Sequence, residues 1–429
     1  MKKKAKVIQK KQAVSEDLGV KKTKIRVIGI GGGGGSIVSE IAAKMPKASF
    51  VIANTDSQAL KNRNKKASVF NFGQSLTHGL GTGMNAGVGR EAALLEKDKI
   101  KKLMEGYDLC ILVSCLGGGT GSGAAPVFAK ISRSLGNLTY GIFTLPLKFE
   151  GEKKMEMALE ALKEVKNYLN AVTLIPNEKV FQVIDKSTPL REAFSIVNKH
   201  LSESLGGLIE TIYEPGIINI DFADLRTVLD GRGRVAYLNT IETEKKEGSL
   251  KEFLSKILSS PFYPYSVKGA KGVLLNITGE KSLSLDEVNQ ISKTISDLTN
   301  AKAKIIFGVS QKSKNANSIK TTVFATGCSF KLDQPKSKEA IKKSALKKKK
   351  VEKKKRKNKP KIQKRKTIKK RRKPKPKKEE SVAVPVKVEM ERKNGLQVKH
   401  EVEEVEKELQ EKEDIWETPA FLRQNEQEK

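Results

Sequence analysis

The chain has 429 residues, with 83 lysines and arginines against 49 acidic residues and a formal net charge of +34 at pH 7. That length allows two or three domains. The three cysteines include no CxxC pair and there are only three histidines, which excludes a disulfide scaffold and a histidine-rich metal site. No secretory signal and no run of about 18 apolar residues occurs. We therefore expect a cytosolic protein.

The positive charge lies mainly at the two ends of the chain. Residues 331–380 contain 27 basic and 5 acidic residues, and residues 1–24 contain 9 and 2. A lysine-rich segment with almost no aromatic residues cannot bury enough apolar area to fold. We predict a disordered basic arm over 1–24, a disordered lysine-rich linker over 331–380 and an acidic tail over 381–412.

From residue 25 the pattern is that of an α/β protein. An apolar run over 25–30 predicts a strand, and it ends in five consecutive glycines, Gly31 to Gly35. A helix with Ile37, Ile41 and Met45 on one face should follow. Further strands are predicted at 50–53, 67–70, 109–114, 140–145 and 172–175, and helices at 91–104, 124–134 and 153–169. Short buried strands that alternate with helices predict a parallel, doubly wound sheet.

A second, smaller α+β domain is predicted over 219–330. A long helix over 189–213, with its connection to 218, should join it to the first domain at 25–188. The pattern then predicts a short helix at 222–229, strands at 272–278, 304–309 and 321–326, and a helix at 285–298. Ser284 and Glu287 have the spacing of a capping box at the start of that last helix.

Two glycine-rich loops point to a phosphate ligand. The first matches G-x-G-x-x-G from Gly29 to Gly34, which alone is a weak indication of a nicotinamide nucleotide. The second runs from Gly117 to Gly123 and adds the hydroxyls of Thr120 and Ser122. Two such loops on one sheet favour a polyphosphate held by backbone amides from two sides. A nicotinamide-dependent oxidoreductase remains an alternative, but it would leave the second loop unexplained.

Acidic residues after the long helix are candidates for catalysis. Asn219, Asp221 and Asp224 could orient or deprotonate a water beside a magnesium-bound γ-phosphate. The alternative is that Asp221 simply caps the helix that follows, which is a common role for aspartate. From these residues alone the capping role is favoured, and the two roles are compatible.

The string Gly117-Gly118-Gly119-Thr120-Gly121-Ser122-Gly123 after a strand resembles the signature of the tubulin/FtsZ superfamily. The resemblance extends over 24–328, through Phe149-Glu150-Gly151, Ile175-Pro176-Asn177 and the segment 216–224. It implies a tubulin/FtsZ-type fold with a GTP-binding and a GTPase-activating domain. It also implies a GTPase that polymerises head to tail into a cell-division ring and hydrolyses GTP at the subunit interface. A tubulin-like filament protein with little or no GTPase activity is the alternative.

The resemblance also assigns roles to individual residues. GTP or GDP would be bound with Mg²⁺ held through the phosphates and no metal site of the protein's own. Lys154 stands where the family has an arginine that faces the phosphates, and Cys115 stands where it has a glycine. The residues expected to bind the nucleotide are Gly31, Gly32, Gly33, Gly34, Gly35, Ser36, Gly118, Gly119, Thr120, Gly121, Glu150, Lys154 and Asn198.

The end of the chain contains an apolar island. Residues 413–424 include the single tryptophan, Trp416, and then Phe421, Leu422 and Arg423. This island resembles the family's docking peptide for a membrane-tethering division protein, which would concentrate the chain at the division site. The lysine-rich linker could contact an anionic membrane or nucleic acid, and a DNA-partitioning filament is the corresponding alternative.

Overall fold

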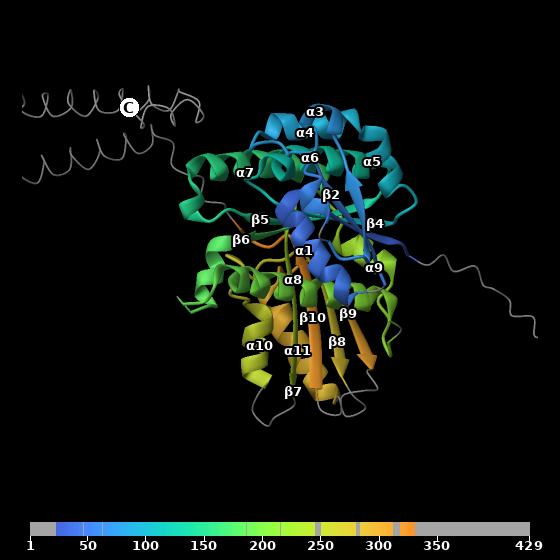
Figure 1. The fold of residues 1–429 in the computed structure, drawn as a ribbon. Helices are drawn as coiled ribbons and strands as arrows, with labels where there is room; N and C mark the ends of the chain where they lie inside the picture. Colours follow the sequence, from blue (N-terminus) through green and yellow to red (C-terminus); the bar gives the residue numbers. More distant parts are fainter. Residues whose placement is uncertain are drawn as a thin grey trace, which may run out of the picture. The chain divides into compact units, whose positions relative to one another are not determined.

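The computed structural model describes residues 23–330, except 46, 62, 186, 215, 245–249, 280–283 and 312–317. The predicted linker, acidic tail and docking peptide lie outside the described residues, as does nearly all of the predicted N-terminal arm. The described strands form a 10-stranded sheet in the order β3-β2-β1-β4-β5-β6-β7-β10-β8-β9. The predicted α/β architecture is confirmed (Figure 1).

The first half of the sheet is entirely parallel. Its strands are β1 (Ile25–Ile30), β2 (Ser49–Asn54), β3 (Ala67–Asn71), β4 (Leu109–Cys115), β5 (Leu138–Leu145) and β6 (Ala171–Pro176). Strands covered on both faces become continuous apolar runs, and β4 and β5 are buried along almost their whole length. All six strands were predicted from the sequence, including the edge strand β3, which is partly exposed.

Helices cover both faces of this half-sheet. Helix α1 (Gly31–Lys44) packs on β1, β2 and β4 from one side. On the other side lie α4 (Ala86–Leu95), α5 (Lys97–Met104), α6 (Gly119–Ser134) and α7 (Glu152–Val165) (Figure 1). The short helices α2 (Gln58–Lys61) and α3 (Gln74–Thr77) lie in connections. The single helix predicted at 91–104 is wrong, because the backbone leaves the helical region at Glu96 and two helices result.

The second half of the sheet is mixed. It contains β7 (Arg234–Glu244), β8 (Gly272–Gly279), β9 (Lys304–Gln311) and β10 (Ser318–Thr326), with β10 antiparallel to β7 and β8. Its helices are α9 (Phe222–Val228), α10 (Leu250–Leu258) and α11 (Leu285–Leu298). β7 joins the two halves through two residue pairs with β6. Sequence reasoning missed β7 and α10. The predicted domain boundaries remain a prediction.

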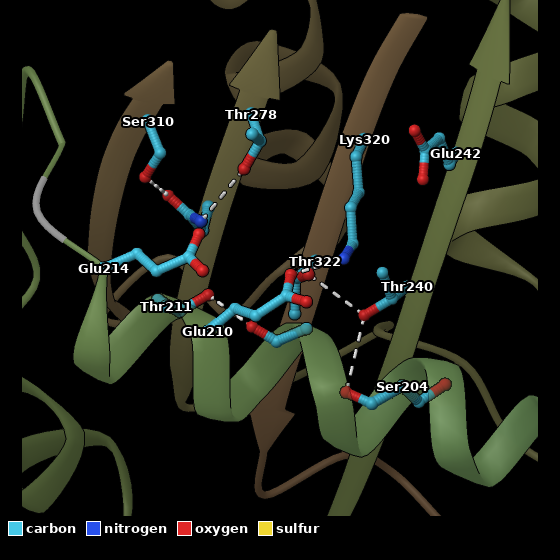
Figure 2. A network of polar contacts seen from close by, with 12 residues as sticks. Ser204, Glu210, Thr211, Glu214, Thr240, Glu242, Thr278, Ser310, Lys320 and Thr322 are labelled. Carbon is cyan, nitrogen blue, oxygen red and sulfur yellow. Dashed lines mark hydrogen bonds and ion pairs between the residues drawn. The ribbon is translucent and has the colours of Figure 1, made fainter. Parts of the chain in front are cut away.

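Helix α8 (Leu190–Tyr213) connects the halves, and its contact with the second half includes a network of polar side chains (Figure 2). The hydroxyls of Thr240 and Thr322 form a hydrogen bond of 2.9 Å next to the helix. Lys320 forms an ion pair with Glu210 of α8. A Cβ added at Gly207 would lie 2.3 Å from Oγ1 of Thr240. The glycine therefore allows the helix to approach the sheet closely, and α8 holds a fixed position on this half.

Candidate functional site

A cavity of about 990 Å³ lies at the carboxyl ends of the parallel strands. Its walls come from both glycine-rich loops, a third loop at 80–84, the turn before α7 and the first turns of α8. In open parallel α/β sheets this edge is the usual place for a ligand. Three other cavities in the described part of the chain are smaller, at about 300 to 390 Å³.

Two helix N-termini open into this cavity without a side-chain cap. Helix α1 begins after Ile30 and helix α6 after Gly118, and neither cap residue gives a side-chain hydrogen bond to its helix. The two starts lie side by side, since a Cβ added at Gly31 would be 3.1 Å from the backbone N of Gly121. Unpaired N–H groups and the positive ends of two helix dipoles together favour a polyphosphate.

The glycines of the second loop are required by geometry. Gly117 has φ +101°, a conformation that residues with a Cβ rarely adopt, and its N–H donates to Oγ of Ser122 at 2.8 Å. A Cβ added at Gly119 would lie 2.3 Å from Oγ1 of Thr82, so the third loop packs directly on the second. The Thr120 hydroxyl is also engaged within the protein, at 2.7 Å from the hydroxyl of Thr55. The cradle is therefore built mainly from backbone.

The structure brings all but two of the predicted nucleotide-binding residues together around the cavity. Those that line it are Gly31, Gly32, Gly33, Ser36, Gly118, Gly119, Thr120, Gly121, Glu150, Lys154 and Asn198. The exceptions are Gly34 and Gly35, which are buried and do not line it. A Cβ at Gly34 would lie 2.4 Å from the carbonyl O of Val113, and one at Gly35 would lie 2.7 Å from Cγ2 of Ile52. Both glycines allow α1 to approach the sheet, and their contact with the nucleotide stays a prediction.

Side chains at the turn before α7 place charge at the cavity wall. Nζ of Lys154 lies 3.0 Å from Oε2 of Glu150, whose Oε1 accepts the N–H of Leu147 at 2.9 Å. The glutamate is therefore held in place, and the lysine amine is oriented near the glycine-rich loops. Cys115 also lines this wall, and burial raises the pKa of its thiol. A neutral thiol is a packing group here rather than a nucleophile.

The opposite end of the cavity is formed by α8 and the outer turns of α1. Phe194 and Val197 supply apolar surface there, while Asn198, Asn177 and Glu40 supply polar groups. Sequence reasoning missed Glu40, although it lies four residues after Ser36 and so on the same face of the helix. An aromatic ring with a few polar groups suits a planar heterocyclic base.

The predicted catalytic residues lie away from the cavity. Asp221 caps α9, since its Oδ1 accepts the N–H of Asp224 at 2.8 Å, and Oδ2 of Asp224 accepts the N–H of Asp221 at 3.0 Å. The predicted capping role is thus confirmed. Asn219 accepts a hydrogen bond from the N–H of Gly216. None of the three lines the cavity.

This fold and cavity define a nucleotide-binding α/β protein whose sheet continues into a second, mixed half. Residues 24–185 match the Tubulin/FtsZ family, GTPase domain, and residues 235–329 match the FtsZ family, C-terminal domain. The cell division protein FtsZ of Coxiella burnetii is 38% identical over 305 residues, which is 71% of this chain and 78% of that protein.

Solved structures give the same result. An FtsZ dimer from M. jannaschii is 34% identical with a TM-score of 0.64, covering 72% of this chain and 90% of that one. CetZ1 from Haloferax volcanii, 22% identical with a TM-score of 0.61 over 75% of this chain and all of its own, shares the fold. The chain belongs to the FtsZ family of tubulin-like cell-division GTPases. The oxidoreductase alternative is not favoured.

No helix in the described part of the chain is both long and apolar enough to span a bilayer.

Proposed function

We propose that this GTPase polymerises head to tail in the cytoplasm and builds the ring at the division site, with each GTP hydrolysed at the junction of two copies. The proposal rests on the position of the acidic loop, residues 219–224, which contains Asn219, Asp221 and Asp224. Asn198 lines the nucleotide cavity, whereas Asp221 follows the other end of α8. The helix between Asn198 and Tyr213 is about 22 Å long. The carboxylates of one copy do not line its own cavity, and we expect those of a second copy to act on the nucleotide.

Exposed apolar side chains support the same arrangement. Phe149 and Phe181 are 70% and 53% exposed on the nucleotide-binding half, and Phe149 precedes the cavity residue Glu150. On the other half, Ile217 and Phe307 are 73% and 42% exposed. Ile217 lies just before the acidic loop in sequence, and Phe307 lies two residues before Val309, which pairs with Ile218. Two different apolar surfaces on one chain suit a head-to-tail interface, which continues as an open filament.

In the proposed junction the acidic loop faces the γ-phosphate of the neighbouring copy. Asp221 and Asp224 would orient or deprotonate the attacking water, and Asn219 would help to fix the loop. Lys154 would offset negative charge on the phosphates, as a point charge without the two-pronged geometry of an arginine.

Mg²⁺ would be held by the phosphates themselves. The described residues contain no group of three histidine, cysteine or acidic side chains able to hold a metal. Bound in this way, the ion would neutralise charge on the β- and γ-phosphate oxygens. The backbone amides of the two glycine-rich loops would bind the remaining phosphate oxygens.

The dependence of GTP hydrolysis on protein concentration tests the proposal. Phosphate release per molecule should be near zero in dilute protein and rise steeply above the concentration at which GTP-dependent sedimentation begins. A turnover per molecule that is the same below and above that concentration would show that one copy is sufficient for hydrolysis.

The C-terminal partner assignments are also proposals, on residues outside the described part. An apolar island with the only tryptophan, Trp416, and with Phe421, Leu422 and Arg423 would bind in the groove of a membrane-tethering division protein. The lysine-rich linker would add a salt-dependent contact with an anionic membrane or nucleic acid. Phe421→Ala should abolish recruitment to the tether while leaving sedimentation with GTP unchanged. Loss of sedimentation in this variant would instead place the peptide in the filament contact.

A further inference from the structure

We infer that Glu40 is a specificity-determining residue that selects guanine by accepting hydrogen bonds from the edge of the base. The inference rests on the proposed orientation of the nucleotide, with its phosphates at the glycine-rich loops. Glu40 belongs to the same helix as Gly31 and follows it by about 14 Å of helix axis. Both residues line the cavity, so α1 extends from the phosphate end to the base end.

The Glu40 carboxylate is held in position by α8. Its Oε2 accepts a hydrogen bond from Nδ2 of Asn198 at 2.9 Å, and its Oε1 accepts one from the Ser195 hydroxyl at 3.3 Å. Each oxygen of an ionised carboxylate can accept about two hydrogen bonds. One acceptor position therefore remains on each oxygen, in a side chain whose direction is already fixed.

Among the described residues no lysine or arginine is paired with this carboxylate. Glu150, in contrast, is paired with Lys154. A half-buried, unpaired negative charge at a cavity wall favours a ligand that offers hydrogen-bond donors there. The nearby ring of Phe194 and the side chain of Val197 provide apolar surface for a flat base.

Guanine meets these requirements and the other common purine does not. Guanine presents N1–H and an exocyclic amino group side by side, which a carboxylate can accept together. Adenine presents a lone pair at N1 and only C–H at position 2, so its edge would face the carboxylate without donating to it. Hypoxanthine lacks the amino group, and xanthine carries a carbonyl in its place. A built hydrogen-bonding site discriminates strongly against a ligand that leaves it unpaired.

A purely structural role for Glu40 makes a different prediction. The hydrogen bond to Asn198 also links α1 to α8, and loss of such a link would weaken every nucleotide by the same factor. Direct recognition of the base changes the ratio between nucleotides. Glu40→Gln separates the two cases, because glutamine has nearly the same shape and still offers an oxygen to Asn198. Its NH₂ group would now donate, so it would match the carbonyl of xanthine and oppose the amino group of guanine.

The experiment measures displacement of a fluorescent GDP analogue from the full chain by GTP, ITP, XTP and ATP. Wild type should bind GTP more tightly than ITP, with XTP and ATP weakest. Glu40→Gln should weaken GTP about 10- to 100-fold and bind XTP more tightly than wild type does. As a matched control, Glu214→Gln removes a carboxylate that links the far end of α8 to Lys47 at 2.8 Å, outside the cavity. It should leave all four affinities unchanged.

Two results would overturn the inference. One is a Glu40→Gln chain that keeps the wild-type order and ratios of GTP, ITP and XTP. The other is an equal loss for all four nucleotides, which would identify Glu40 as a link between helices. Failure of the wild-type chain to bind any guanine nucleotide would instead contradict the proposed function itself.

Discussion

Replacing Asp224 with alanine should separate catalysis from stability. Among the described residues its side chain accepts the N–H of Asp221, at 3.0 Å, as one half of the capping pair of α9. Loss of one such hydrogen bond costs about 1 kcal/mol of unfolding free energy. Loss of a group that orients or deprotonates the attacking water should lower turnover by a factor of about 10² to 10⁴. GTP binding should be unchanged, because Asp224 does not line the cavity.

Glu287→Ala is the matched control for this variant, because Glu287 accepts the N–H of the cap residue of α11 as Asp224 does in α9. Ser284 and Glu287 form the same reciprocal capping pair at the start of α11, far in sequence from the acidic loop. Denaturant titration should give both variants a similar loss of stability, of about 1 kcal/mol. Phosphate release from sedimented polymer should fall only in Asp224→Ala, whose filaments should persist longer. Normal turnover in Asp224→Ala, or an equal loss in both variants, would refute the catalytic assignment.

Three further outcomes follow from the described contacts. Gly207→Ala should destabilise the protein by about 1–3 kcal/mol because its Cβ would clash with Thr240. Gly206→Ala, whose Cβ would lie in ordinary contact with Sδ of Met45 at 3.4 Å, should stabilise it by about 0.5–1 kcal/mol in denaturant titration. Burial lowers the pKa of His200 to about 4, so the unfolded chain gains its proton first as the pH falls. Unfolding free energy should therefore drop by about 2 kcal/mol between pH 7 and 5, a slope that His200→Phe should remove. Gly118→Asp should abolish GTP binding by repulsion while the thermal midpoint stays the same or rises, since aspartate is a favourable cap.

The parallel half of the sheet could be predicted because its strands are buried on both faces. Apolar runs such as that of β4 need no knowledge of their neighbours, and the capping pair of α11 is local in sequence. β7 was missed because its residues alternate between two environments. Tyr237 and Asn239 bond to the backbone near α10, while Thr240 faces α8. Such a strand is specified by its partners rather than by its own composition.

The part of the candidate site that would bind phosphate through backbone amides could be predicted from the sequence. The glycine-rich loops were identified from their strings, but the strings could not separate glycines that line the cavity from Gly34 and Gly35, which pack on the sheet. That distinction depends on the distance between α1 and β4. Glu40 was missed because its partner, Asn198, lies on a helix far along the chain. Contacts of this kind arise only from the tertiary structure.

Mixing two inactive variants tests the shared junction most directly. Asp224→Ala retains the nucleotide cavity but lacks the carboxylate, and Gly118→Asp retains the carboxylates but cannot hold GTP. Each alone should release phosphate at a few per cent of the wild-type rate or less. Mixed in equal amounts, they form junctions in which GTP on one copy faces an intact acidic loop of the other. The account predicts that phosphate release from the mixture exceeds the sum of the separate variants several-fold. A mixture no more active than its components would contradict hydrolysis between two copies.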